Sequence, residues 1–300
     1  MVIRPRYKNV LKLIGNTPVA QLHFDSPATV LAKLEYLNPG GSIKSRPALF
    51  MIEEAEKTGQ LKPGGTIIEA SSGNQGIALA MIGAAKGYKV IITVPDKTSK
   101  EKIATLKAYG AKVFACPDTK DKNDPNGYHA KAQYFLATIP NAFMPNQYHN
   151  KQNPLAHYKT TGPEIWKQTS GTVTHFIAGK GSCGTISGIG KYLKEQNPNI
   201  RIIAVDEAPT TKKNKHKIEG IGVGINTNLD TSVVDEFVFI DGSDAFAMAK
   251  KMAKEGFLIG LSSGAVMHAT QQYAKKLTQD DVVVTILADS GRAYLTKLFL

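Results

Sequence analysis

Residues 66–86 read TIIEASSGNQGIALAMIGAAK and show a pattern that recurs throughout the chain. Residues 66–70 form a short run rich in Thr and Ile that predicts a strand. The apolar run that begins at residue 77 predicts a helix. A strand, a tight turn and a helix in this order are the building unit of α/β proteins.

The loop between this strand and helix, SSGNQG at residues 71–76, is a candidate binding site. Open α/β sheets bind ligands where a strand gives way to a helix, because backbone N–H groups and the helix N-terminus face the crevice there. A structural interpretation is equally open from the residues alone. Ser71 and Ser72 could be helix caps, and Asn74 could be a left-handed turn residue.

The same alternation continues along the rest of the chain. Short β-branched runs are separated by amphipathic helical stretches, which predicts an α/β fold around parallel strands. The runs are almost continuously apolar, as strands buried on both faces are. Besides 66–70, the predicted strands cover residues 89–95, 111–116, 173–179, 200–207 and 282–289.

Two predicted helices have recognisable ends. One presents an apolar face and stops near Gly59; its face consists of Ala48, Leu49, Met51, Ile52 and Ala55. For the other, Thr98 and Glu101 resemble a capping box, and the helix is expected to end at Gly110. Residues 118–127, DTKDKNDPNG, are typical of a surface loop rather than a domain linker.

The composition is that of a globular enzyme. Hydrophobic residues make up 42% and charged residues 21% of the 300 residues, and a chain of this length can bury a sizeable core. Two cysteines, Cys116 and Cys183, cannot build a disulfide framework. The chain start lacks the apolar stretch of a signal peptide, and no segment reaches transmembrane length. We therefore expect a cytoplasmic protein that does not associate with membranes, and we identify no candidate metal ligand.

The net charge of +12 would attract anions in general. The densest basic run comprises Lys212, Lys213, Lys215, His216 and Lys217. It has no interleaved aromatic residues and no nucleic-acid-binding module around it. We interpret it as a solvated loop, with an anion or partner site as the alternative, and expect no nucleic-acid binding.

A second candidate loop is NPGGSIKSRP at residues 38–47, which contains Lys44 and leads into a predicted helix. Pro47 is compatible with a first helical turn, where its missing N–H would have no partner anyway. Taken alone, Lys44 is most simply an ordinary solvated lysine. A lysine that forms a Schiff base needs a sheltered environment, which the sequence does not reveal.

A third candidate loop, GKGSCGT at residues 179–185, follows one predicted strand and precedes a helix. Its glycines permit close backbone approach to a phosphate, and Ser182 and Thr185 add hydroxyl donors. The loop also fits G-x-G-x-x-G, and Asp206 and Glu207 end a strand about 20 residues further on, as in a dinucleotide-binding fingerprint. These residues therefore support a nicotinamide-dependent oxidoreductase at least as well as a phosphate-bearing cofactor of another kind.

All three loops, in this order, resemble the cysteine synthase and cystathionine β-synthase family of fold-type II pyridoxal-phosphate enzymes. The resemblance runs almost end to end, through LIGNTPVAQL, AKLEYLNPGGSIKSR, IIEASSGNQGIALA, AHYKTTGPEIW, THFIAGKGSCGTISGIGKYLKE, HKIEGIGVG, GLSSGA and DSGRAYL. AHYKTTGPEIW and IGAAKGYKV look particularly like the B-type cysteine synthases. The resemblance implies a two-domain α/β fold, similar to the tryptophan synthase β subunit, with parallel sheets wrapped by helices. Residues 1–39 and 149–300 would form a larger cofactor-binding domain, and residues 40–148 a smaller mobile domain.

The resemblance also implies roles for individual residues. Lys44 matches the Schiff-base lysine for pyridoxal 5′-phosphate, and Asn74 matches the asparagine that hydrogen-bonds the ring hydroxyl. Ser262 matches the serine that faces the pyridine nitrogen. The phosphate loop corresponds to Gly181, Ser182, Cys183, Gly184 and Thr185. The contacts to the substrate carboxylate correspond to Ser71, Ser72, Gly73, Gln75 and Gln147.

Some positions depart from the common family pattern. Ser45 follows Lys44 at the position where the family usually has Asp. Pro47 lies unusually close to Lys44 in the sequence. Gln75 replaces the usual Thr, and Cys183 replaces a frequent Gly. None of these changes removes a catalytic group.

The function implied is replacement of the β-substituent of an activated serine, with O-acetylserine and sulfide giving L-cysteine and acetate. Cystathionine β-synthase, which uses homocysteine, is the alternative; Glu219 in HKIEGIG favours it, because several of those enzymes have EGIG where sulfhydrylases often have QGIG. A catalytically silent binding relative is a third hypothesis, which retention of Lys44 argues against, and a nicotinamide oxidoreductase is the last. The resemblance further implies a homodimer and a possible complex with serine acetyltransferase.

Overall fold

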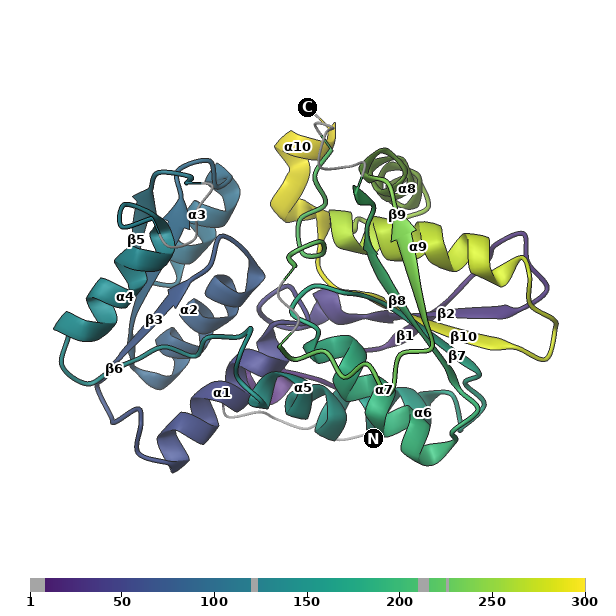
Figure 1. The fold of residues 1–300 in the computed structure, drawn as a ribbon, viewed down its shortest axis with the longest axis horizontal. Helices are drawn as coiled ribbons and strands as arrows, with labels where there is room; N and C mark the ends of the chain where they lie inside the picture. The colour runs from purple at the N-terminus through teal and green to yellow at the C-terminus, as the bar shows by residue number, and fades with distance from the viewer. Residues whose placement is uncertain (1–8, 120–123, 210–215, 225–226, 300) are drawn as a thin grey trace, which may run out of the picture. The chain divides into compact units, whose positions relative to one another are not determined.

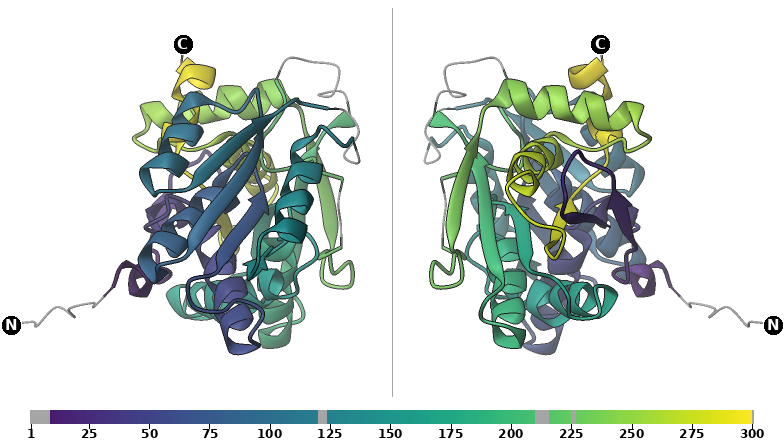
Figure 2. Two further views of the ribbon diagram at one scale, coloured as in Figure 1. Left: turned by 90° about the vertical axis from the view of Figure 1, so that its left-hand side faces the viewer. Right: turned by 90° about the vertical axis from the view of Figure 1, so that its right-hand side faces the viewer.

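The computed structural model describes residues 9–119, 124–209, 216–224 and 227–299. The predicted basic run lies mostly outside these ranges, since Lys212, Lys213 and Lys215 are not among the described residues. The chain divides into two compact units, labelled by their elements in Figure 1; Figure 2 gives two further views of the same ribbon. The first comprises the residues up to Asn16 together with Leu37–Asn146, and the second comprises Thr17–Tyr36 and the residues from Gln147 onward.

The first unit is built on a parallel sheet of four strands in the order β5-β4-β3-β6. Its strands are β3 (Thr66–Ala70), β4 (Lys89–Pro95), β5 (Lys112–Cys116) and β6 (Ala142–Phe143). Its helices are η1 (Val10–Leu13), α1 (Ser45–Lys57), α2 (Asn74–Lys86), α3 (Lys100–Ala108) and α4 (Tyr128–Thr138). The core gathers around α2, which is buried from Gln75 to Gly83 against the central strands. Apolar packing on all sides explains why this helix shows little amphipathic periodicity.

The second unit is built on a sheet of six strands in the order β1-β2-β10-β7-β8-β9. β1 runs antiparallel to β2, and the other neighbouring pairs are parallel. The strands are β1 (Val19–Leu22), β2 (Thr29–Leu34), β7 (His175–Gly179), β8 (Arg201–Glu207), β9 (Glu236–Ile240) and β10 (Val282–Leu287). All six strands predicted from the sequence are therefore present in the two sheets, and β1, β2, β6 and β9 are additional.

Helices cover both faces of the second sheet. In Figure 1, α8 (Gly242–Lys254) and α9 (Leu261–Ala274) lie on one face, and α5 (Gln152–Ala156), α6 (Gly162–Gln168) and α7 (Gly184–Gln196) lie on the other. A π-helical segment, η3 (His157–Thr161), joins α5 to α6. The remaining short elements are η2 (Glu35–Leu37), η5 (Gly291–Tyr294) and α10 (Leu295–Phe299). The central strands β7, β8 and β10 are buried on both faces, as strands of a sheet covered on both faces are.

Residues 9–16 cluster with the first unit, whereas the sequence analysis assigned residues 1–39 to the second. The physical reason is that Leu11 of η1 is buried in the apolar core around α2. Residues 17–36 do belong to the second unit, where β1 and β2 extend its sheet. The mobility expected for residues 40–148 stays a prediction.

The start of α3 also differs from expectation. Its N-cap is Ser99, whose side chain accepts a hydrogen bond from the backbone N–H of Lys102. Thr98, which the sequence suggested as the cap, is one residue too early for this role. The expected end near Gly110 is confirmed, since α3 stops at Ala108 and Gly110 has a φ of +84°.

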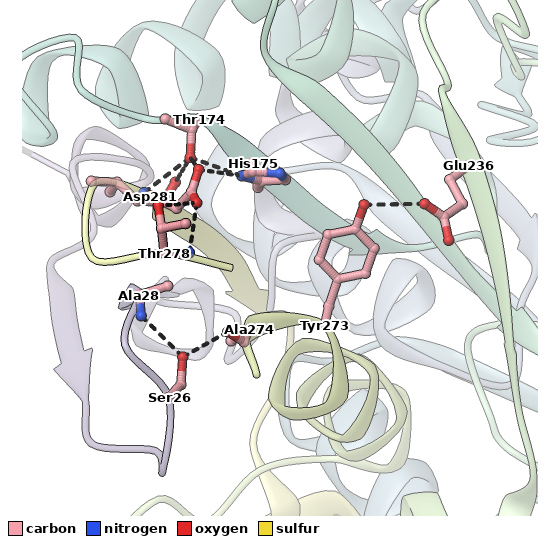
Figure 3. Close-up of polar contacts among 10 residues, drawn as sticks. Ser26, Ala28, Thr174, His175, Glu236, Tyr273, Ala274, Thr278 and Asp281 are labelled. Atoms are coloured by element: carbon pink, nitrogen blue, oxygen red, sulfur yellow. Dashed lines mark hydrogen bonds and ion pairs between the residues drawn. The ribbon is translucent and has the colours of Figure 1, made fainter. Parts of the chain in front are cut away.

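The amino ends of β7 and β10 carry a polar network at the edge of the sheet opposite to the candidate phosphate loop (Figure 3). The Thr174 hydroxyl contacts both His175 Nδ1, at 2.8 Å, and Asp281 Oδ1, at 3.2 Å. Asp281 also accepts hydrogen bonds from the backbone N–H and the hydroxyl of Thr278, both at 2.9 Å. Nearby, the Tyr273 hydroxyl donates to Glu236 at 3.1 Å.

Among the described residues, no helix is long and apolar enough to cross a membrane. The longest described helix, α9, has 14 residues.

Candidate active site

Lys44 lies at the N-cap position of α1, at the end of the glycine-rich loop predicted to carry chemistry. The loop is tightly wound, because Gly41 N–H donates to Asn38 O at 2.7 Å and Lys44 N–H approaches Ser42 Oγ at 3.3 Å. Gly41 has a φ of +74°, which only glycine adopts without strain. Asn38 is buried, and its Oδ1 accepts from Gly15 N–H at 2.9 Å. The half-buried Lys44 is therefore held by a loop fixed on both sides.

The loop at residues 71–76 leaves the carboxyl end of β3 and enters α2. Ser71 Oγ accepts from Gly76 N–H at 3.1 Å and from Gly73 N–H at 3.4 Å. Gly73 is the N-cap, so Asn74 is the first residue of the helix and is not a left-handed turn residue. Ser71 therefore satisfies backbone N–H groups at the start of the helix, in agreement with the structural interpretation of this loop. The side chains of Asn74 and Gln75, which follow along the chain, lie at the N-terminus of the helix.

Gln75 and Ser45 stand out in the first unit. Gln75 is 1% exposed, and neither Oε1 nor Nε2 of its amide has a hydrogen-bond partner among the described residues. Ser45 is fully buried, and its hydroxyl likewise has no partner there. Both are positions where the sequence departs from the family pattern. Unpaired buried polar groups cost about 1–3 kcal/mol each and are therefore rare away from functional sites.

The third loop leaves the carboxyl end of β7 and enters α7, as predicted. Cys183, with a φ of +64°, makes the left-handed turn that starts the helix, and its side chain is buried. Glycine is required at two neighbouring positions. A Cβ on Gly181 would lie 2.0 Å from Gly220 O, and one on Gly184 would lie 2.0 Å from Asn153 Oδ1.

Two buried side chains that the sequence analysis missed contact the hydroxyl residues of this loop. Asn153 Nδ2 donates to Ser182 Oγ at 3.0 Å, and His157 Nε2 lies 3.4 Å from Thr185 Oγ1. Both are fully buried and stand four residues apart, on α5 and at the start of the π-helical segment. Their spacing of four residues places them on one face of the helical segment, which is the only sequence signal that marks them as a pair.

Ser262 and Gln147 join the same group of residues in the second unit. Ser262 is the second residue of α9, and a Cβ built on Gly220 would meet its side chain at 3.3 Å. The carbonyl of Gln147 accepts from Asn153 Nδ2 at 2.9 Å. Contacts therefore link Gly181 to Ser262 through Gly220, and Ser182 to Gln147 through Asn153. Lys44 and residues 71–75 belong to the first unit.

Asp206 and Glu207, the acids of the dinucleotide hypothesis, are engaged within the second unit. Asp206 pairs with Lys180 at 2.7 Å and accepts from Gly222 N–H at 2.9 Å. Glu207 accepts from Ile218 N–H at 2.7 Å. Both residues are buried, so their carboxylates fix the segment that carries Gly220 rather than presenting a ribose contact.

The comparison with protein families decides between the hypotheses. The sequence matches the family described as pyridoxal-phosphate dependent enzymes over residues 10–289. The chain belongs to this family. The nicotinamide-dependent hypothesis is thereby wrong, and the expected cofactor, pyridoxal 5′-phosphate, is confirmed at the level of the family.

Curated relatives include both enzymes that the resemblance suggested. The chain is 43% identical to a cysteine synthase of Staphylococcus aureus, covering 96% of this chain and 95% of that protein. It is 44% identical to a cystathionine β-synthase of Apis mellifera, covering 96% of this chain but only 60% of that protein. The chain thus spans nearly all of the bacterial relative and three fifths of the insect one.

Solved structures agree with the α/β fold of this pyridoxal-phosphate dependent family. A hydrogen sulfide-producing enzyme from Fusobacterium nucleatum has a TM-score of 0.91 and 38% identity, with 98% of this chain and 99% of that chain covered. An O-acetylserine dependent cystathionine β-synthase from Helicobacter pylori has a TM-score of 0.88 and 37% identity, with 99% and 100% covered.

The geometry of the second unit, taken alone, fits the phosphate group of pyridoxal 5′-phosphate. Gly181 and Gly184 lie too close to their neighbours for any side chain, and the loop meets the N-terminus of a helix of 13 residues. The first N–H groups of a helix have no intrahelical acceptor and favour an anion.

Proposed function

We propose that this chain catalyses β-replacement on O-acetylserine, with sulfide as the nucleophile, to give L-cysteine and acetate. The observation that carries the proposal is the 43% identity to the Staphylococcus aureus cysteine synthase across nearly the full length of both proteins. A match of that extent includes all three candidate loops, so it covers the residues that would do the chemistry.

In this proposal four parts of the chain hold the cofactor. Lys44 Nζ holds it covalently, and Asn74 donates a hydrogen bond to its ring hydroxyl. The backbone N–H groups and hydroxyls of residues 181–185, at the start of α7, receive the phosphate. Ser262 at the start of α9 faces the ring nitrogen. Support comes from the geometry of the second unit, in which the phosphate loop and Ser262 both pack against Gly220.

Pyridoxal 5′-phosphate, when bound, supplies an electron-withdrawing ring that makes the α-hydrogen of an attached amino acid acidic. Lys44 is then the group that takes this proton on Nζ and later returns it to the α-carbon, because the same amine is released when the substrate replaces it. The hydroxyl of Ser262 leaves the ring nitrogen without a fixed positive charge, as a neutral hydroxyl does not stabilise a pyridinium in the way a carboxylate does. This favours prompt loss of the β-substituent.

The substrate carboxylate is assigned to Ser71, Ser72, Gly73, Gln75 and Gln147. Support comes from the start of α2, where backbone N–H groups and the unpaired amide of Gln75 offer donors to an anion. Gln147 and its backbone, called the Gln147 segment below, are anchored through the Gln147 carbonyl. This carbonyl accepts from both Asn153 Nδ2 and Asn228 Nδ2 at 2.9 Å.

The test begins with the visible absorption spectrum of purified protein, before and after O-acetylserine is added. We expect a yellow protein whose spectrum changes with O-acetylserine and returns when sulfide is added, with release of cysteine. Borohydride should fix the cofactor to the peptide that contains Lys44, as mass analysis would show. Lys44→Ala should abolish turnover while the circular dichroism stays unchanged. A colourless protein that takes up no added pyridoxal 5′-phosphate would contradict the proposal.

Cystathionine β-synthase is the second candidate, favoured by the 44% identity to the Apis mellifera protein and by Glu219. A site for homocysteine needs a partner for the ammonium of a second amino acid, and Glu219 could supply one. Its carboxylate, however, already pairs with Lys297 at 3.1 Å. This contact supports sulfide as the nucleophile.

The two candidates separate in one experiment. After O-acetylserine has changed the spectrum, sulfide and homocysteine are added separately at equal concentration and the return of the original spectrum is timed. We expect the faster return with sulfide. A much faster return with homocysteine, lost in Glu219→Gln, would establish the second candidate instead.

A further inference from the structure

Asn153 lies on α5, outside the three loops to which the sequence analysis assigned roles. Its side chain is fully buried in the second unit. Both hydrogen bonds of its side-chain amide go to residues of the proposed site, and its amide oxygen lies against the start of the helix that follows the phosphate loop. The contacts therefore bear on what the residue does.

The two hydrogens of Asn153 Nδ2 are both used. One is donated to the carbonyl of Gln147 at 2.9 Å, and the other to Ser182 Oγ at 3.0 Å. Because amide hydrogens diverge in one plane, these two acceptors are held at a fixed separation. Asn153 thus joins a proposed carboxylate contact and a proposed phosphate contact through a single rigid group.

The position of the amide is fixed from a third side by α7. Its Oδ1 lies so close to Gly184 that a Cβ there would be 2.0 Å away. This oxygen is buried and has no hydrogen-bond partner among the described residues. An apolar side chain of similar size would fill the space without the cost of an unpaired acceptor. The Nδ2 donors are therefore the feature that requires an asparagine here.

We propose that Asn153 is a positioning residue, which sets the orientation of the Ser182 hydroxyl toward the phosphate of the cofactor and couples the phosphate loop to the Gln147 segment. The inference rests on the proposed function. When Ser182 Oγ accepts from the amide, its own hydrogen is directed to another acceptor, and a phosphate oxygen is such an acceptor. Asn153 acts through Ser182 and does not itself touch the cofactor.

The test compares two ligands that differ only in the phosphate. Cofactor-free full-length protein is titrated with pyridoxal 5′-phosphate and with pyridoxal, and the affinity ratio is read from the visible absorption of each. The wild-type protein should prefer pyridoxal 5′-phosphate strongly. In Asn153→Ala the ratio should fall by about tenfold or more, the loss expected when one hydrogen bond to a charged group is misdirected. Affinity for pyridoxal itself should change little.

Asn228→Ala is the matched control. Asn228 Nδ2 donates to the same Gln147 carbonyl at 2.9 Å, so its loss loosens the Gln147 segment and leaves the hydrogen bond from Asn153 to Ser182 in place. The ratio should stay at the wild-type value in this variant. In Asn153→Ala/Ser182→Ala, the ratio should be no lower than in Ser182→Ala alone, because both changes remove the same effect.

A second variant covers the case in which Asn153→Ala does not fold. Asn153→Asp keeps the size of the side chain but replaces the donor by an acceptor, so it should lower the ratio at least as much. An unchanged ratio in a folded Asn153 variant, or an equal fall in Asn228→Ala, would overturn the inference while the proposed function stands. A wild-type protein that binds neither ligand would overturn the proposed function and the inference with it.

Discussion

At the scale of single residues, two of the departures from the family pattern, Gln75 and Ser45, coincide with unsatisfied polar groups of the first unit, where Thr98 is the other described residue of this kind. Gln75 and Ser45 are both buried, and their side-chain polar atoms have no partner among the described residues. A protein retains such groups at a cost in stability when they serve binding. The sequence showed which residues were unusual, but their burial and lack of partners depend on tertiary packing and could not be predicted.

This reasoning gives a prediction for Gln75→Met, a change that keeps the length of the side chain and removes its polar atoms. The unfolding free energy should rise by about 1–2 kcal/mol, because two unpaired polar atoms leave the interior. The KM for O-acetylserine should rise at the same time, since the amide no longer contributes to substrate binding. Thermal unfolding and steady-state kinetics measure the two effects.

Ser45→Ala is the control for this prediction, because it removes a buried unpaired hydroxyl at a position to which no substrate contact is assigned. It should be at least as stable as the wild type and should keep its KM. A loss of stability in Gln75→Met would show that the amide is already satisfied in the free protein.

The site residues divide in the same way into those that a sequence can reveal and those that it cannot. The three loops drew attention through their glycines, serines and a lysine, but these residues left structural roles and a dinucleotide site open, and only the family resemblance assigned the chemistry. Asn153 and His157 were missed, because a buried asparagine or histidine carries no local pattern, and their partners Ser182 and Thr185 lie about 30 residues away in the sequence.

At the scale of elements, the position of the phosphate loop depends on how closely α7 packs against α5 and the π-helical segment. Gly188 is the point of contact: a Cβ there would lie 2.2 Å from Pro154 O and 2.9 Å from His157 Cβ. The contacted atoms belong to the backbone or are the Cβ of a side chain, so they cannot move aside without moving the backbone. The absence of a side chain at Gly188 therefore sets the distance between the two helical segments.

We predict that Gly188→Ala lowers the unfolding free energy by about 1–3 kcal/mol, the usual cost of overpacking, even though alanine favours helices. Affinity for pyridoxal 5′-phosphate should also fall, because the displaced segment carries Asn153 and His157. Chemical denaturation and cofactor titration measure these effects.

Gly190→Ala, on the same helix, is the matched control. The nearest neighbours of a Cβ there would be methyl groups of Ile202 and Val233, each at 3.2 Å, which can shift slightly. Its stability should stay within about 1 kcal/mol of the wild type. Equal losses in Gly188→Ala and Gly190→Ala would show that the close approach at Gly188 is not special.

Strands were predictable where they were apolar throughout, and less so where exposed or charged residues interrupt the apolar run. β9 exposes Phe237 and Phe239 on one side, and β2 carries the buried Lys33, so neither has the continuous apolar character of the central strands. Lys33 is tolerated because it pairs with Glu164 at 2.8 Å and donates to Thr17 O at 2.9 Å. Such pairing through distant residues has no signature in a single strand.

At the scale of the whole molecule, the sequence indicated the α/β class but not the division of the chain. The chain leaves the first unit after Asn16, returns at Leu37 and leaves again after Asn146. Composition does not mark these crossings: the one at Leu37 precedes a Pro- and Gly-containing stretch at residues 38–41, but the similar stretch at residues 63–65 lies inside the first unit. The boundaries inferred from the resemblance followed the second and third crossings more closely than the first.

The polar network at the amino ends of β7 and β10 suggests how the stability of the second unit depends on pH (Figure 3). Burial is the main cause that lowers the pKa of His175; the Arg201 charge adds to the lowering, and Asp281 opposes it. The backbone N–H of Thr278 is the first cause that lowers the pKa of Asp281, although burial opposes it. The folded protein therefore holds His175 neutral and Asp281 charged more firmly than the unfolded chain does.

As the pH falls, the lowered pKa of His175 and the lowered pKa of Asp281 both reduce the stability of the folded protein. An unfolded histidine takes up a proton near pH ~6.5, before the folded one, so its contribution to stability is complete above that pH and is lost as the pH falls toward the lower folded pKa. Asp281 adds a further loss only below pH ~4, through the range of its own lowered pKa. Between pH 7.5 and 5.5 the histidine should dominate.

We therefore predict that the unfolding free energy falls between pH 7.5 and 5.5, and that the fall is smaller in His175→Asn. Asparagine offers an amide near the position of Nδ1, which lies 2.8 Å from the Thr174 hydroxyl, but it does not titrate. Urea denaturation at pH 7.5, 6.5 and 5.5 gives the slope for each protein, and cofactor-saturated protein is used throughout so that ligand linkage is held constant. His23→Asn replaces an exposed histidine of the same unit and should keep the wild-type slope. If His175→Asn loses stability with falling pH as steeply as the wild type, the acid sensitivity arises elsewhere in the chain.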